Sequence, residues 1–294
     1  MKKALILLHL SVFLAGFTGI FGKLISLNAG LISWYRLFLS GLILSLILAV
    51  SGRLKKISFK DVLRIAFAGS LLGLHWIFFY ASIKYANISV GVVCFSLGSF
   101  FTALFEPLIN RRKFSIAELL LSGIILSGIA LIFGLDATYR TGIIMGVISA
   151  MLVALYTIFN KRLTKSFNSS TITLYTMLGG CAGVTMVMPL YLYFSPVDTL
   201  IPSLADFGYL LLLSLVCTVL MYSMITTALH KISAFTVNLA FNLEPLYSII
   251  LAIIFFKENR ELSIGFYAGL SLIVFSVVLQ MFRVAQEQKR MSVA

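Results

Sequence analysis

Long apolar runs separated by short polar connections occupy most of the chain. Ten runs of about 20 residues can be delimited, and about 20 residues of apolar helix cross the ~30 Å hydrocarbon core of a bilayer. These runs cover residues 4–22, 31–50, 64–83, 88–109, 116–135, 142–160, 171–194, 206–229, 234–256 and 263–282. The pattern therefore predicts an all-α polytopic membrane protein with ten transmembrane helices.

Composition agrees with this pattern and excludes an ordinary soluble domain. Hydrophobic residues make up 60% of the 294 positions and charged residues 11%, with a mean hydropathy of +1.05, whereas soluble domains average about 25% charged residues. The basic start followed by an apolar run resembles a signal peptide. The run is long and has no clear small-residue cleavage site, so we interpret it as an uncleaved first span. The three cysteines lie inside apolar runs and predict no disulfide framework.

The basic residues alternate between the two sides of the predicted membrane. With the N-terminus placed inside, 17 of the 23 Lys and Arg residues fall on the inner side and five on the outer side, while Arg36 lies within a span. This bias over short loops predicts both termini on the cytoplasmic side of the inner (plasma) membrane. The net charge of +13 then reflects topology, and no nucleic-acid partner is expected. The basic stretch GRLKKISFK, residues 52–60, fits either contact with anionic lipid or a solvated loop.

The two halves of the chain share short motifs in the same order. TGIFGKL at the end of the first span matches YTIFNKRL at the end of the sixth, YASIKYANISV matches TALHKISAFTV, and SIAELLLSGIILSGIALI matches SIGFYAGLSLIVFSVVL. We therefore divide the chain into residues 1–137 and 138–294, with five spans each. Because five is odd, the second half must enter the membrane from the opposite side. Inverted repeats of this kind are typical of secondary transporters, whose substrate sites lie near the midplane between the halves.

Four features occur together in this chain: a lysine that ends the first span of each half, WYRLFLSG in the second span, NLEPLYSIILAIIFFKENRELS in and after the ninth, and the 5+5 repeat. In combination they resemble the EamA family of the drug/metabolite transporter superfamily. The first half departs from the pattern, with Ser99 where a proline is expected and Arg112 where the second half has Glu258. The resemblance implies a ten-helix exporter of small metabolites, often amino acids, and it does not fix the substrate.

Two charged side chains lie inside predicted spans. Glu244 stands about 15 Å into the ninth span, at the midplane, and Pro245 follows it. A charge facing lipid there costs roughly 2.5–3.5 kcal/mol, so Glu244 should face the bundle, while Pro245 would free a carbonyl one turn back. Arg36 lies about 7 Å from the outer end of the second span and also needs a partner or water. The sequence leaves open a direct Arg36–Glu244 pair, snorkelling of Arg36 to the outer surface, and a purely structural Glu244.

Polar and aromatic residues at similar depth predict a cavity between the halves. At 100° per residue, Asn238, Asn242 and Glu244 share one face of the ninth span. The predicted substrate-binding residues are Phe17, Arg36, His75, Phe79, Tyr156, Asn238, Asn242 and Glu244. A histidine at the depth of His75 can titrate near neutral pH or serve only in hydrogen-bonded packing.

Two further features concern packing. Glu106, near the inner end of the fourth span, is close in sequence to Arg111 and Arg112, which predicts an ion pair at the rim. Close helix packing is predicted at the GxxxG pairs Gly69/Gly73, Gly179/Gly183 and Gly265/Gly269.

These features predict a transporter rather than an enzyme. We expect export of small amphipathic metabolites by alternating access. Amino acids are preferred, because one acid, one base and an aromatic wall suit a zwitterion with an apolar side chain. The alternatives are efflux of organic cations or drugs anchored on Glu244, or of nucleotide-related metabolites. A membrane-embedded lipid enzyme ranks last, because the sequence offers no metal-ligand or acid/base cluster.

No cofactor is expected beside the small-molecule substrate and the lipid bilayer. The sequence shows no nucleotide-binding motif, so protons are the simplest coupling ion for uphill export, with facilitated diffusion as the alternative. A monomer and a homodimer are both compatible with the sequence.

Overall fold

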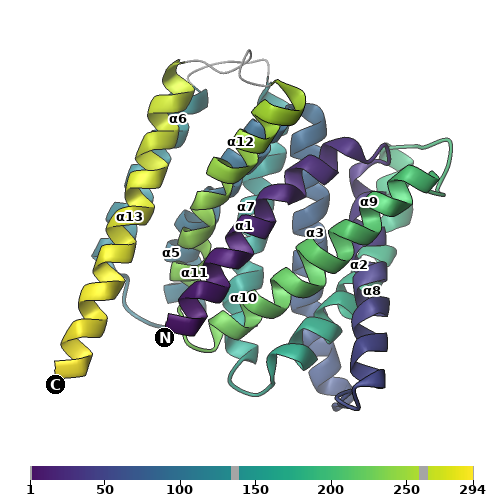
Figure 1. Ribbon diagram of the computed structural model, residues 1–294, viewed down its shortest axis with the longest axis horizontal. Coiled ribbons are helices and arrows are strands. Elements are labelled where there is room, and N and C mark those ends of the chain that lie inside the picture. The colour runs from purple at the N-terminus through teal and green to yellow at the C-terminus, as the bar shows by residue number, and fades with distance from the viewer. Residues whose placement is uncertain (1, 134–138, 258–263, 294) are drawn as a thin grey trace.

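The computed structural model describes residues 2–133, 139–257 and 264–293, and within these ranges every regular element is helical (Figure 1). The first half consists of α1 (Lys2–Leu24), α2 (Ala29–Val50), α3 (Phe59–Tyr85), α4 (Ile88–Phe95), α5 (Leu97–Asn110) and α6 (Ile116–Phe133). The second half consists of α7 (Arg140–Leu163), α8 (Ser169–Phe194), α9 (Leu204–Ser214), the π-helix η2 (Leu215–Leu220), α10 (Met221–Leu229), α11 (Ala234–Ala240), the 3-10 helix η3 (Phe241–Leu243), α12 (Glu244–Phe256) and α13 (Ile264–Val293).

The described helices form ten membrane crossings. Eight are long and apolar enough to span a bilayer, and the shorter apolar stretches Ile116–Ile132 and Tyr267–Gln280 supply the other two. The predicted spans are confirmed within a few residues, except that α13 continues to Val293. The predicted division between residues 137 and 138 borders on residues outside the described ranges.

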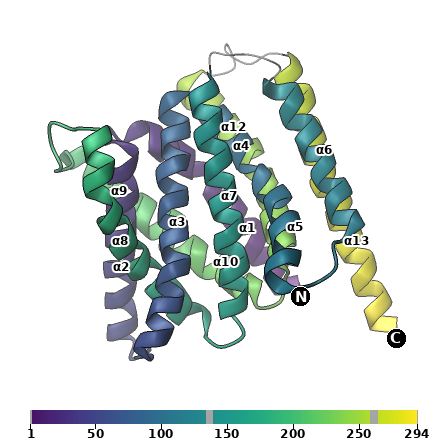
Figure 2. The same ribbon diagram turned by 180° about the vertical axis from the view of Figure 1, so that it is seen from behind.

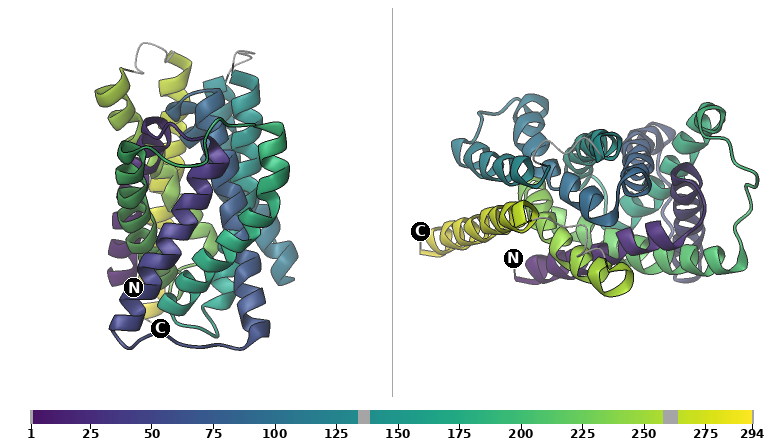
Figure 3. Two further views of the ribbon diagram at one scale, coloured as in Figure 1. Left: turned by 90° about the vertical axis from the view of Figure 1, so that its right-hand side faces the viewer. Right: turned by 90° about the horizontal axis from the view of Figure 1, so that it is seen from above.

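The crossings alternate in direction along the bundle. α1 begins and α13 ends at the same end of the molecule, as an even number of crossings requires (Figure 1). We call this the terminal end, and the other the opposite end. Seen from behind and from above, α6 and α13 stand together at one edge of the bundle, while α2, α8 and α9 form the other edge (Figures 2 and 3). The two halves interleave between these edges, with α3 packed on α7 and α8 and α1 packed on α10 and α12.

Polar caps set the starts of six helices. The side-chain oxygen of an Asn or Ser accepts a hydrogen bond from the backbone N–H three residues later, which satisfies a donor that the helix itself cannot pair. These capping residues are Asn28, Ser58, Asn87, Asn168, Ser203 and Ser233. The caps explain why helices start beside short polar connections.

The fourth crossing has matching ends in the two halves. In the first half it begins after the cap Asn87 and ends at Arg111, whose φ is 50°. In the second half it begins after the cap Ser233 and ends at Lys257, whose φ is 56°. Arg111 and Lys257 are the two non-glycine residues with positive φ in the described ranges, and both stand the same distance from their caps. The inverted repeat inferred from short motifs therefore has a geometric counterpart.

Both fourth crossings are also interrupted. α4 and α5 meet at Ser96, and α11 and α12 are separated by η3. Glu244 and Pro245 are therefore the first residues of α12 and do not stand in mid-helix, which corrects the continuous helix predicted over 234–256. A proline in a first turn lacks only an N–H that would be unpaired anyway. A carboxylate there faces the positive end of the helix dipole.

Glycines allow the closest helix crossings. A Cβ atom added at Gly180 of α8 would lie 2.6 Å from the backbone oxygen of Gly69 in α3, and one at Gly73 would lie 2.6 Å from Val184. Between α6 and α13, a Cβ at Gly128 would lie 2.6 Å from the backbone oxygen of Gly269. Close packing at the predicted pairs in α3 and α8, and at Gly269, is confirmed.

The predicted rim ion pair is also confirmed, since Arg112 Nη2 lies 3.0 Å from Glu106 Oε2. In the second half, Glu258 occupies the position equivalent to Arg112, and it lies outside the described residues.

Replacing Gly180 by Leu is expected to lower the yield and thermal midpoint of the folded protein in detergent. The added side chain meets backbone, which cannot yield as a flexible side chain can, and overpacking of this kind costs about 1–3 kcal/mol. Gly123→Leu is the matched control, because a Cβ there meets no atom within 4 Å. Equal losses in the two variants would contradict a close α3–α8 crossing.

Candidate functional site

A cavity of about 30 Å³ lies between the two halves. It is lined from α1, α2, α3, α4, α10, η3 and α12, and its polar walls include Arg36, His75 and Glu244. A second cavity of about 20 Å³ lies beside it and shares Phe95, Tyr222 and Phe241 as walls. Each space is large enough for a water molecule or two and far too small for a metabolite.

Arg36 is fully buried and bonded through all three of its nitrogens. Nε donates to Thr218 Oγ1 at 2.7 Å, Nη1 to the Tyr80 hydroxyl at 2.9 Å, and Nη2 to the carbonyl of Cys217 at 2.6 Å. The guanidinium also lies 3.8 Å above the ring of Trp76, a cation–π geometry. Snorkelling of Arg36 to the outer surface is therefore wrong.

The partners of Arg36 on the eighth crossing come from the π-helix η2. Cys217 and Thr218 both lie in this element, and the Thr218 hydroxyl donates to the carbonyl of Leu213 at 2.8 Å. Single π-helical turns are rare, and those that occur are frequently at functional sites. They take backbone groups out of the regular i to i+4 hydrogen-bonding pattern of the α-helix. Apolar sequence gives no signal for such a turn, so these partners could not be predicted.

Glu244 shares the cavity with Arg36 but does not pair with it. Its side chain is 3% exposed, and no residue in the described ranges donates a hydrogen bond to its carboxylate or forms an ion pair with it. The direct Arg36–Glu244 pair is therefore absent from this conformation, because Tyr80, Thr218 and Cys217 already hold the guanidinium. The carboxylate is left facing the cavity.

His75 joins α3 to α7. Its Nδ1 lies 3.0 Å from the carbonyl oxygen and 2.8 Å from the hydroxyl of Ser149, and that hydroxyl lies 3.1 Å from the carbonyl of His75. A proton on Nδ1 donated to the Ser149 carbonyl would leave Nε2 as an acceptor, an assignment made from the hydrogen bonds. The ring also packs on Phe79 and Phe95, at 5.9 and 5.4 Å between centroids.

Tyr156 and Asn238 line the smaller cavity. Asn238 Nδ2 donates to Thr102 Oγ1 at 2.7 Å and so links α11 to α5. Asn242 is buried beside the cavities but lines neither, because its Nδ2 donates to Ser99 Oγ at 3.1 Å. Ser99, which stands where a proline was expected in the first half, thus accepts a hydrogen bond from the second half.

Phe17 lies away from both cavities. It is half-buried and packs edge-on against Phe13 at 5.5 Å, and Phe13 packs in the same way against Tyr247. Ala15 and Thr18 occupy the cavity-facing positions of α1 instead. A one-residue error on a helix rotates the side chain by 100°, and the apolar sequence of α1 does not fix that rotation.

The cavities are lined by more aromatic residues than the sequence predicted. Trp76 packs edge-on against Tyr222 at 5.5 Å, and Tyr222 lies 6.0 Å from Tyr156. Trp76 and Tyr80 are four residues apart in α3, so their common face could have been read from GLHWIFFYASIKY. Nothing in the sequence distinguished Tyr222 from the other tyrosines.

Hydrogen bonds close the bundle on both sides of the cavities. At the opposite end, the N–H and hydroxyl of Ser26 donate to the two oxygens of Asp206 at 2.8 and 2.6 Å. At the terminal end, Arg162 Nε donates to Asn110 Oδ1 at 2.8 Å, and Lys161 Nζ donates to the carbonyl of Leu229. In the described conformation, hydrogen bonds therefore link neighbouring helices at both ends of the bundle.

Two inverted five-helix halves around a closed polar and aromatic centre define a multi-pass membrane protein of the secondary-transporter class. The chain belongs to the EamA-like transporter family, whose model matches it twice, over residues 2–134 and 140–282. The family consists of transporters and not of enzymes, which implies a small-molecule substrate and a membrane environment.

Relatives agree with this assignment. The chain is 29% identical over 236 residues to an "Uncharacterized transporter" of Haemophilus influenzae, covering 76% of this chain and 74% of the relative. It is 23% identical over 280 residues to the "Uncharacterized transporter YxxF" of Bacillus subtilis, covering 92% and 88%. A solved structure titled "Crystal structure of protein" has the same fold, with a TM-score of 0.69, 13% identity, and coverage of 94% of this chain and 97% of that one.

Proposed function

We propose that this transporter exports small amphipathic metabolites, with amino acids as the preferred class, by alternating access. The observation that carries the proposal is the presence of Arg36 and Glu244 in one cavity without a bond between them. Opposite charges that face one cavity without forming an ion pair can receive the two charges of a zwitterion.

Arg36 retains donors for a carboxylate. A guanidinium carries five N–H groups, and three are used by Thr218, Tyr80 and Cys217. Two remain, and the group is held in place by its other bonds and by the ring of Trp76. A rigid, preordered cation loses little conformational freedom when it binds an anion.

Glu244 supplies the complementary anion. A buried carboxylate without donors is stable only with a proton, a water molecule or a cationic ligand. We therefore propose that Glu244 binds the ammonium group of the substrate. The rings of Phe79, Phe95 and Phe241 would then contact the apolar side chain of the substrate.

Binding requires one end of the bundle to open, because a 30 Å³ space cannot hold an amino acid. The interruptions at Ser96 and at η3 stand at equivalent places in the two halves. We propose them as hinges, since helix interruptions let a terminal segment move without disturbing the rest. Opening one end at a time would separate either the Ser26–Asp206 contacts or those of Arg162 with Asn110.

Proton exchange is the coupling mechanism that we propose. Glu244 can hold either a proton or the substrate's ammonium group, and this competition would link the two fluxes. His75 is less suited, because Ser149 already engages its Nδ1. Facilitated diffusion is the alternative and would need no exchange at Glu244.

The experiment is transport of a labelled metabolite panel by purified protein in proteoliposomes, with and without an imposed pH gradient. We expect apolar amino acids to move, and to accumulate against their gradient only when protons flow the other way. Transport that ignores the pH gradient would remove proton coupling but keep the substrate assignment. Movement of organic cations alone would replace the assignment with cation efflux, which the aromatic walls and the open carboxylate also favour.

We further propose residence in the inner (plasma) membrane, with the terminal end in the cytoplasm, from the excess of Lys and Arg in the loops of that end. Reporter fusions at the two termini are expected to agree on a cytoplasmic location. A C-terminal fusion active outside the cell would contradict the proposed orientation.

A further inference from the structure

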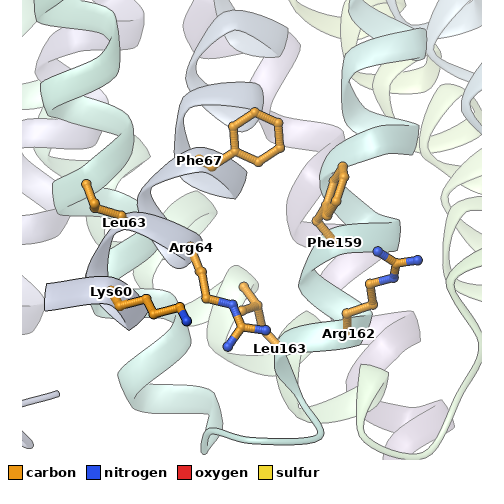
Figure 4. Close-up of a pocket in the computed structure, with 7 residues that line it drawn as sticks. All are labelled: Lys60, Leu63, Arg64, Phe67, Phe159, Arg162 and Leu163. Atoms are coloured by element: carbon orange, nitrogen blue, oxygen red, sulfur yellow. The ribbon is translucent and has the colours of Figure 1, made fainter. Parts of the chain in front are cut away.

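A large groove lies on the outside of the bundle, between α3 and α7 at the terminal end (Figure 4). Its volume is about 480 Å³, many times that of the central cavities. The groove is lined by Lys60, Leu63, Arg64, Phe67, Phe159, Arg162 and Leu163. It shares no residue with the candidate substrate site, so the proposed transport mechanism does not account for it.

Charge and apolar surface are separated along the groove. Lys60 and Arg64 stand in the first turns of α3, and Arg162 stands in the last turn of α7. Phe67 lies two turns further into the bundle than Lys60, about 10 Å along the helix. It meets Phe159 edge-on at 5.2 Å between centroids (Figure 4). The groove therefore offers cations at the level of the helix ends and aromatic rings deeper in.

The apolar part of the groove is open to the membrane. Leu63 is 55% exposed and Phe67 54% exposed, although α3 also buries a long face inside the bundle. The occupant must therefore suit hydrocarbon at one end and three cations at the other.

The cations have capacity for an anion. Arg162 uses Nε on Asn110 and Nη2 on the carbonyl of Ile109, which leaves three of its five N–H groups. Arg64 lies 3.3 Å from Asp61, but the Arg64 side chain is 60% exposed and the Asp61 side chain 28%, and ion pairs open to solvent are weak. Lys60 is exposed at the same level.

We propose that this groove is a binding site for an anionic phospholipid, with the phosphate on Lys60, Arg64 and Arg162 and the acyl chains against Phe67 and Phe159. Basic pockets between transmembrane helices at the cytoplasmic side recognise anionic headgroups in this way. The site gives a lipid-binding role to Lys60, the last residue of the basic stretch 52–60, which sequence alone left undecided between lipid contact and a solvated loop.

The test is lipid binding to the purified full chain in neutral detergent, followed by native mass spectrometry with dioleoylphosphatidylglycerol or dioleoylphosphatidylcholine. The double variant Lys60→Gln/Arg64→Gln keeps the contacts of Arg162 with α5. Its control is Lys55→Gln/Lys56→Gln, which removes the same charge from the loop just before α3, outside the groove.

We expect the groove variant, which loses two cations, to bind phosphatidylglycerol roughly 25-fold more weakly than the wild type, since each cation near an anionic surface contributes roughly fivefold. The control should stay within about twofold, and Lys60→Gln alone should lose about fivefold. Excess inorganic phosphate should not displace the lipid, because it lacks the acyl chains.

Equal losses in the groove variant and the control would overturn the proposal in favour of diffuse attraction by the loop. Equal binding of the neutral and the anionic lipid would overturn it in favour of an ordinary lipid-facing surface. Full displacement by inorganic phosphate would make the groove a phosphate site instead. None of these results bears on transport at the central cavity, so the two proposals are tested separately.

Discussion

Replacing Arg36 by Gln is expected to lower the folded yield sharply and to abolish transport. The change removes three hydrogen bonds and a cation–π contact, and leaves the buried Thr218 hydroxyl, Tyr80 hydroxyl and Cys217 carbonyl partly unpaired. Breaking a buried charged cluster costs about 3–5 kcal/mol in soluble interiors. Yield by fluorescence-detected size exclusion and the thermal midpoint measure the effect.

Two companion variants make this result specific. Arg53→Gln removes an exposed arginine and should leave yield unchanged. Arg36→Lys keeps the charge, but a point-like ammonium cannot reach three acceptors in different directions, so its yield should be intermediate and its transport lost. A stable, active Arg36→Gln protein would contradict any central role for the guanidinium.

Replacing Glu244 by Gln is expected to lower transport at least about 30-fold at normal folded yield. The two side chains are nearly isosteric, and no protein donor to the carboxylate is lost among the described residues. Removing one charge from a buried charge contact, here with the substrate, costs about 2–5 kcal/mol. Initial rates in proteoliposomes measure the loss, and Asp198→Asn, in an exposed loop, is the control.

A falling yield in Glu244→Gln would contradict this account and indicate a structural carboxylate. The double variant Arg36→Gln/Glu244→Gln separates the two explanations further. A direct ion pair would make the second change restore the yield lost by the first, whereas the absence of an ion pair between the two side chains predicts no recovery.

The helices were predictable because the bilayer fixes their length and hydrophobicity. The opposite directions in which the halves enter the membrane followed from the odd number of spans in each half. The repeat and the family followed from motifs such as NLEPLY. The interruption before Glu244 was signalled by Pro245 but was misjudged as a distortion within one helix, although a proline fits a first turn better.

The side-chain partners were less predictable. Depth along a helix follows from counting residues, which predicted Glu244 at the midplane and Arg36 nearer the outer end, and the two side chains line the same cavity with His75. Rotation about the helix axis does not follow when nearly every position is apolar, and Phe17, which lines neither cavity in this conformation, illustrates this. The π-turn that gives Arg36 its carbonyl partner depends on packing between helices and has no local sequence signal.

In the proposed mechanism, Arg36 and Glu244 together receive the two charges of an amino acid. Its most direct measurement compares proteoliposome transport of leucine, leucinamide and 4-methylpentanoate, which share one side chain but carry both charges, only the positive charge, and only the negative charge. We expect transport of leucine well above that of both analogues in the wild type, and loss of that preference in Glu244→Gln. Leucinamide transported as fast as leucine would contradict it and would leave Glu244 as a simple anchor for cations.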